Sequence, residues 1–187
     1  MTDPDPSWAL TDDALVLILH AENDITKNLQ TSQTTSGMRL GQLGGTRADE
    51  LWRQETAVLR LISTVEAYTD AASKFYFTKK CSTLPKMPFT WPDRIKYYKN
   101  KHAIDLEKCD GWGQVKAGID LRNCLAHGLG NLTEILLSEE SLGSRMKLID
   151  VSVGGNRMHS TMQTVPKLAS GCRHLVLDIE EKLVSQL

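Results

Sequence analysis

Apolar residues recur at helical spacing over most of this chain. A first helix is expected to begin at Thr11, whose hydroxyl can cap it, and its apolar face consists of Leu15, Ile18, Leu19, Ile25 and Leu29. Residues 30–45 are rich in Ser, Thr, Gln and Gly, so they are expected to form a flexible polar loop. A long central helix is then expected from Thr46 to about Lys79, because Thr46 opens a Ser/Thr-x-x-acid helix start.

The second half of the chain predicts shorter elements before a final helix. Helices are expected at 93–102, 112–126, 133–140 and 164–187. The last of these carries an apolar stripe of Leu168, Cys172, Leu175, Val176, Ile179 and Leu183. Two strands, 146–153 and 156–161, flank Gly154-Gly155 and predict a β-hairpin. The pattern therefore predicts one all-α domain over 1–187, a bundle of four or five helices with a small hairpin insertion at 145–161 before the C-terminal helix.

Composition narrows the classes of protein that fit. With 41% apolar and 24% charged residues among 187, the chain is expected to be globular. Its net charge of −1 excludes a uniformly polybasic nucleic-acid binder, so any such binding has to come from a local patch. The apolar run 14–19 is too short to cross a bilayer, and the start of the chain is acidic. The expectation is a soluble, cytoplasmic protein with reduced cysteines and no membrane partner.

The candidate chemistry lies between Leu121 and Gly128, near the expected end of a helix. Histidine moves a proton near neutral pH, and arginine holds the negative charge of a reacting phosphate, so Arg122 and His127 suit phosphate chemistry. Five residues along a helix correspond to about 140° of rotation, so one copy does not place both side chains on one stripe. A second copy packed across this helix would bring two such pairs into one cleft, which is a geometric reason to expect a dimer.

The order Arg122-Asn123-x-x-x-His127-Gly128 resembles the signature of the HEPN superfamily, an arginine followed by a histidine after four to six residues. The active members of that superfamily are ribonucleases. The segment 59–68, with its Glu-Ala-Tyr, also looks like the long helix that precedes the signature. The resemblance covers about 50–132 and a closing helix, and it leaves the N-terminal helix, the polar loop and the hairpin unmatched.

The resemblance implies a function. Arg122 and His127 would be catalytic, Asn123 would be a supporting polar residue, and the active protein would be a homodimer with a composite site that needs no metal or other cofactor. A ribose 2′-OH would attack the adjacent phosphate, so RNA such as tRNA or mRNA would be cut and DNA would not. Family habit suggests a toxin of a toxin–antitoxin pair or an antiphage effector. Glu66 is expected to pair with Arg122 and orient it, although a surface helix pair or a plain buried ion pair fits Glu66 equally well.

A local basic and aromatic segment is the candidate RNA surface. Residues 74–108 hold nine cations, three anions and seven of the 11 aromatics, so this segment is +6 while the rest of the chain is −7. Lysines interleaved with aromatics suit single-stranded RNA, and the candidates are Lys96, Tyr97, Lys99 and Lys101. The alternative is that the lysines solvate a surface and the aromatics pack in the core. The acidic remainder equally suits a regulatory protein, such as an antitoxin that masks the basic face.

Two other functions compete with the ribonuclease. One is a catalytically silent HEPN-like module that mediates dimerisation or binds a partner. The other is an unrelated helical interaction protein in which Arg122 forms a helix-end salt bridge and His127 caps the helix. The silent module predicts that substitution of either residue leaves the fold intact, whereas the interaction protein predicts a loss of thermal stability.

Overall fold

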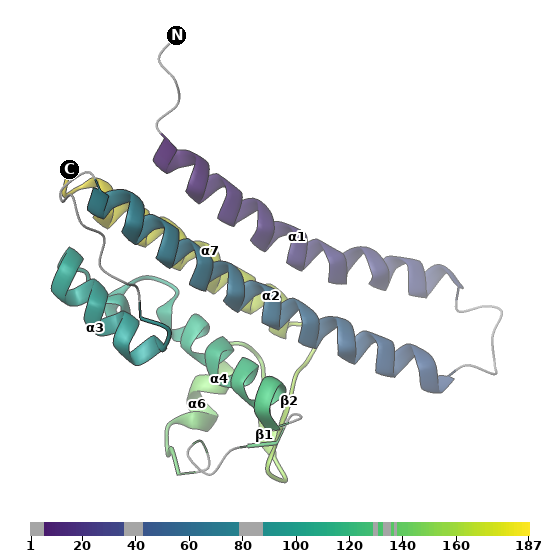
Figure 1. Ribbon diagram of the computed structural model, residues 1–187. Coiled ribbons are helices and arrows are strands. Elements are labelled where there is room, and N and C mark those ends of the chain that lie inside the picture. Colours follow the sequence, from purple (N-terminus) through teal and green to yellow (C-terminus); the bar gives the residue numbers. More distant parts are fainter. Residues whose placement is uncertain (1–5, 36–42, 79–87, 129–130, 133–135, 137) are drawn as a thin grey trace.

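The computed structural model describes residues 6–35, 43–78, 88–128, 131–132, 136 and 138–187 (Figure 1). Its helices are α1 (Pro6–Thr35), α2 (Leu43–Thr78), α3 (Trp91–His102), α4 (Trp112–Gly128), α6 (Leu142–Lys147) and α7 (Thr164–Val184), with a 3₁₀ turn η1 (Leu106–Lys108). The strands β1 (Ser152–Gly154) and β2 (Arg157–His159) form an antiparallel hairpin. The expected all-α class with a small hairpin before the C-terminal helix is therefore confirmed.

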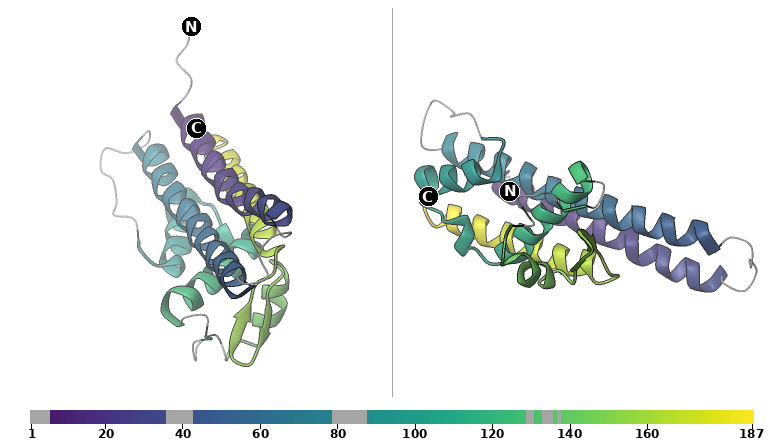
Figure 2. Two further views of the ribbon diagram at one scale, coloured as in Figure 1. Left: turned by 90° about the vertical axis from the view of Figure 1, so that its right-hand side faces the viewer. Right: turned by 90° about the horizontal axis from the view of Figure 1, so that it is seen from below.

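The two longest helices, α1 and α2, run antiparallel and pack against each other along the bundle. Both pack against α7, and α4 packs on α2 and α7 while α6 packs on α4. Figures 1 and 2 show that α1 and α2 extend beyond the other helices at one end of the molecule. The hairpin and α6 lie on the opposite side of α4 from α1 (Figure 1). The elements that carry the candidate site thus lie on a face that α1 does not cover.

The expected stripe on the last helix is confirmed in full. Its six residues, Leu168, Cys172, Leu175, Val176, Ile179 and Leu183, are all buried. They recur three or four positions apart, so they share one face of α7 and pack toward α1, α2 and α4. Burial of this stripe makes α7 the central element of the core.

The expectation that Thr11 caps the first helix is wrong. Helix α1 begins at Pro6, and Thr11 lies inside it, buried, with its hydroxyl oxygen 3.4 Å from the hydroxyl oxygen of Tyr68. The Tyr68 and Tyr76 hydroxyls in turn donate to the Glu180 carboxylate at 3.1 and 2.8 Å. The Thr11 hydroxyl therefore contacts a residue of another helix and does not cap a backbone N–H of its own helix. The network joins α1, α2 and α7.

The flexible loop expected at 30–45 is also mostly wrong. Helix α1 continues to Thr35, and α2 already begins at Leu43, while residues 36–42 lie outside the described part of the chain. Each Ser, Thr or Gln lowers helix stability by less than about 0.7 kcal/mol relative to Ala, so a polar run does not by itself end a helix. Residues 30–45 are polar but contain no proline, which would be needed to break a helix directly.

The hairpin is present but shorter than expected. Residues 142–147 form α6, so a strand beginning at Met146 is wrong, and Met146 and Ile149 are fully buried instead of alternating. The turn lies at Gly155 and Asn156, whose φ angles of 57° and 59° are both positive. Two positive φ angles are what a tight type I′ hairpin turn requires. Of the short helix expected at 133–140, residues 133–135 and 137 lie outside the described residues.

Helix α4 approaches its neighbours closely because it carries glycine at two contact points. A Cβ on Gly118 would lie 2.5 Å from a Leu168 methyl and 2.8 Å from an Ile62 methyl. At the start of α4, Gly111 has φ of +78°, and a Cβ there would lie 2.1 Å from the carbonyl oxygen of Gly171. These glycines place α4 directly on α2 and α7, which determines where its C-terminal end and the candidate residues lie. No described helix combines the length and the apolar character needed to cross a membrane.

The Glu180 network predicts a specific loss of stability. Glu180→Ala removes the acceptor of two buried tyrosine hydroxyls, so we expect the free energy of unfolding to fall by about 3 kcal/mol in urea denaturation. Glu180→Gln keeps an acceptor oxygen and should lose less. Glu181→Ala, on the exposed face of the same helix, is the matched control and should leave the midpoint unchanged. Equal effects of Glu180→Ala and Glu181→Ala would show that the network contributes nothing.

Buried phenols and thiols predict that stability falls at alkaline pH. Burial raises the pKa of Cys109 and Cys172 from 9.0 to about 12, and it raises the pKa of Tyr68 and Tyr98 well above the ordinary 10.0. The native state keeps these protons where the unfolded chain releases them, so the stability is present below about pH 9 and is lost as pH rises above it. Each group contributes a slope of up to about 1.4 kcal/mol per pH unit.

Urea denaturation in reductant, compared between about pH 8 and about pH 11, measures this slope. A free energy of unfolding that stays constant over that range would contradict the alkaline prediction.

Candidate functional site

The three candidate catalytic residues line one cleft. Arg122, Asn123 and His127 line a cavity of about 750 Å³ that is bounded by α2, the start of α3, α4, Leu136 and Glu139. This volume lies in the range of pockets that hold small molecules. The sequence-based grouping of these residues therefore corresponds to one concave surface.

Glu66 connects three helices at this cleft. Its carboxylate accepts a hydrogen bond from the Trp91 indole N–H at 2.9 Å and lies 3.8 Å from Nη2 of Arg122. The Nη1 of Arg122 donates to the Asn123 side-chain oxygen at 3.1 Å. The guanidinium has five N–H donors, so these two contacts leave others available to an anion in the cleft. The expected contact between Glu66 and Arg122 is thus present, while its orienting role stays a prediction.

His127 lies in the last turn of α4, one residue before the helix ends at Gly128. The helical rotation of about 140° suggested that one copy would separate Arg122 from His127. Both nevertheless line the same cleft in a single chain, because the cleft extends along α4 from Lys116 to His127. A second copy is therefore not needed to bring the pair to one cavity, and the homodimer stays a prediction.

The buried carboxylate of Asp120 joins the elements that form the wall of the cleft opposite α2. Asp120 is only 3% exposed, and its carboxylate accepts from Lys116 Nζ at 2.9 Å and from Arg145 Nε at 2.7 Å. Arg145 also pairs with Glu139, and this hydrogen bond lowers the pKa of the Glu139 carboxyl. The network attaches α6 and residue 139 to α4, so it shapes the wall opposite α2.

The charges that line the cleft are mixed and paired. The acids are Glu66, Asp70, Asp120 and Glu139, and the cations are Arg94, Lys116 and Arg122, together with His127. Arg94 is buried, and its Nη1 donates to the Glu66 carbonyl oxygen at 3.0 Å, to the Thr69 hydroxyl at 2.6 Å and to the Asp70 carboxylate. The cleft is therefore not a basic groove, and an anion would bind at individual donors within it.

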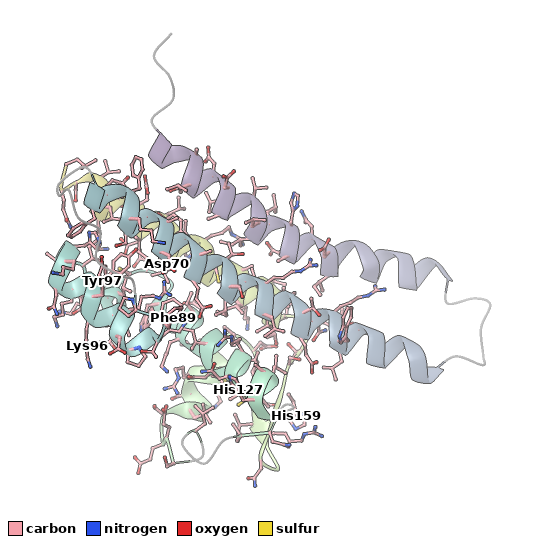
Figure 3. The ribbon with its side chains drawn as sticks, in the orientation of Figure 1. Asp70, Phe89, Lys96, Tyr97, His127 and His159 are labelled. Carbon is pink, nitrogen blue, oxygen red and sulfur yellow. The ribbon has the colours of Figure 1, made fainter. Side chains whose placement is uncertain are left out.

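The candidate RNA-binding residues lie on α3, away from the cleft lining. Lys96, Lys99 and Lys101 are exposed, and none of them lines the cavity. Lys96 lies 3.8 Å from Asp93 and Lys99 lies 3.7 Å from Asp105. Tyr97 is partly buried, with its ring against Tyr98 and His102. Figure 3 shows Lys96 at the outer edge of the molecule and His127 at the end of α4.

Sequence reasoning did not single out several residues that line the cleft, among them Asp70, Asp120 and Glu139, and it counted Phe89 only among the aromatics of the basic segment. Phe89 is 85% exposed, which is unusual for so apolar a side chain. The capping residue Thr90 and Pro92 mark the start of α3, but they do not indicate whether the residue before the cap is exposed. Asp120 gave no signal, because only the fold brings Arg145 to it.

Among the described residues, no three His, Cys, Asp or Glu side chains are grouped so as to hold a metal ion. No protein-family model, no curated protein and no solved structure matches this chain.

The Asp120 network predicts that this wall is important for folding. Asp120→Ala leaves Lys116 and Arg145 without their shared partner, so we expect a loss of about 3 kcal/mol in urea denaturation. The exposed Glu140→Ala, from the same region, is the matched control and should change the midpoint little. A loss no greater than the control's would show that α6 is held to α4 by apolar packing alone.

Proposed function

We propose that this protein is an endoribonuclease that cuts RNA without a metal ion, with Arg122 and His127 as the reacting groups. The observation that supports the proposal most directly is that both residues line one cavity, together with Asn123. The proposal also uses the resemblance of their order to the HEPN signature. It includes a homodimer with a composite site, a cytoplasmic location, and action as a toxin or antiphage effector that an antitoxin or other regulator controls.

The chemical step follows from the two side chains. The 2′-oxygen of a ribose forms a bond to the adjacent phosphorus, and the bond from phosphorus to the 5′-oxygen of the next nucleotide breaks. The 2′-OH proton leaves to a base and the departing 5′-oxygen takes up a proton, and His127 serves one of these two transfers. Arg122 stabilises the charge that develops on the non-bridging oxygens. The products are a 2′,3′-cyclic phosphate and a 5′-OH.

Two features of the cleft fit this step. Glu66 holds one side of the Arg122 guanidinium, so its remaining donors have a restricted direction. His127 is exposed at the end of α4, where a large substrate can reach it. The exposed lysines of α3, Lys96, Lys99 and Lys101, then supply a sequence-independent contact to the RNA backbone beyond the cleft.

A catalytically silent module is the second candidate function. The observation that favours it is the pairing of Arg122 with Glu66 within a cleft of mixed charge. A fully compensated arginine serves to join helices, and the cleft would then receive a partner or a nucleotide without reaction.

Cleavage of total RNA and of a tRNA pool in EDTA tests the proposal. We expect the wild type to produce fragments that end in a 2′,3′-cyclic phosphate, and His127→Ala to be slower by about 10²–10⁴-fold. The proteins are matched for folding and oligomeric state. His174→Ala, an exposed histidine on α7 that does not line the cleft, is the control and should cleave like the wild type.

Either of two results would count against the ribonuclease. A well-folded wild type that cuts no RNA would favour the silent module. A His127→Ala variant that cuts as fast as the wild type would show that the activity resides elsewhere.

A further inference from the structure

Phe89 lies at the rim of the cleft. Its ring is 85% exposed, and it is followed by Thr90, which caps α3 through its hydroxyl and the backbone N–H of Asp93. The cap holds the backbone of Thr90, so Phe89 directly precedes the capped start of α3. An exposed aromatic ring at the rim of a cleft is a platform on which a planar base can stack.

Asp70 lines the same cleft from α2. One oxygen of its carboxylate pairs with the buried Arg94, which holds the group in place. The second oxygen, Oδ2, accepts no hydrogen bond from any residue that the structure describes, and the side chain is 38% exposed. The cleft thus contains a positioned hydrogen-bond acceptor with spare capacity. Figure 3 shows Asp70 on α2 above Phe89.

Both residues line the same cleft as the reacting pair. Asp70 follows Glu66 by one helical turn, about 6 Å along α2. The Glu66 carboxylate in turn lies 3.8 Å from Nη2 of Arg122. Asp70 and Arg122 are therefore associated with neighbouring turns of α2 within one cavity.

We propose that Phe89 and Asp70 form a subsite for one unpaired nucleobase that carries an exocyclic amino group. The base stacks on the Phe89 ring, and its amino group donates to Asp70 Oδ2, while the adjoining phosphate lies at Arg122. The subsite deepens the proposed ribonuclease function and rests on it for the identity of the ligand as single-stranded RNA.

The chemistry of the acceptor selects among bases. Adenine, cytosine and guanine each present an amino group, and a carboxylate accepts from it. Uracil presents a single ring N–H between two carbonyl oxygens, which repel a carboxylate. The subsite therefore favours adenine, cytosine and guanine over uracil. It also requires that the base be unpaired, because the neighbouring bases of a duplex cover the face that would stack on Phe89.

Binding of uncleavable oligonucleotides tests the subsite separately from catalysis. Short fluorescent 2′-O-methyl strands of adenine, cytosine or uracil are titrated with the wild type, Phe89→Leu, Phe89→Trp and Asp70→Asn, and anisotropy is recorded. Trp52→Leu and Glu107→Gln are the controls, since both residues are exposed and neither lines the cleft. Urea denaturation shows that each variant is folded, and competition with AMP or UMP distinguishes a strand from a free nucleotide.

We expect the wild type to bind the adenine and cytosine strands about tenfold more tightly than the uracil strand. Phe89→Leu should weaken binding of all strands by at least about fivefold, whereas Phe89→Trp keeps the stacking face and should bind like the wild type. Asp70→Asn should abolish the preference, because an amide both donates and accepts. The controls should match the wild type.

Equal affinity of the wild type for all strands, or unchanged binding by Phe89→Leu, overturns the subsite. If RNA is cut with dependence on His127 but neither binding effect occurs, the ribonuclease stands and the subsite fails. If both binding effects occur but no RNA is cut, the ribonuclease fails and the cleft is a nucleotide-binding site. Tighter competition by AMP than by the adenine strand would assign the subsite to free nucleotides and overturn the assignment to single-stranded RNA.

Discussion

The close approach of α4 to α2 and α7 determines where everything else in the site lies. It depends on the missing side chain at Gly118, since a Cβ there would overlap methyl groups of both neighbouring helices. A helix that packs at this distance has little freedom to rotate, so its C-terminal half presents Arg122 and His127 to the cleft in a defined direction. The catalytic geometry proposed for this protein is in that sense a consequence of core packing and not of the site residues themselves.

Glu66 links the three helices that form the candidate site. Its side chain joins Trp91 of α3 to Arg122 of α4, and its backbone carbonyl accepts from Arg94. A single position on α2 therefore sets the relation between the start of α3 and the end of α4. The arrangement also explains how a partly buried arginine is tolerated near the acids of the cleft, since each charge has a near partner.

Much of the fold could be predicted from the sequence, because burial follows periodicity. The stripe on α7 follows directly from apolar spacing, and the end of α3 at His102 agrees with the expectation. The expected start of the central helix at Thr46 is wrong, because α2 already begins at Leu43 and the capping pattern at Thr46 lies inside the helix. The N-terminal region could not be placed in this way, because the partner of Thr11 is Tyr68, 57 positions away. At the site, local order identified Arg122, Asn123 and His127, whereas the contact of Asp120 with Arg145 depends on tertiary packing. Local sequence thus predicts which residues carry chemistry better than it predicts which residues surround them.

The pairing of charges in the cleft has a consequence for how it would meet a polyanion. Nucleic-acid phosphates hold condensed counterions, and lysines and arginines that bind the phosphates release these ions, so the affinity falls steeply with ionic strength. Here Arg94, Lys116 and Arg122 are already neutralised by carboxylates of the same chain. Binding of a nucleic acid in the cleft would therefore release few counterions. Its affinity would persist at salt concentrations that dissociate nucleic acid from a nonspecific basic surface.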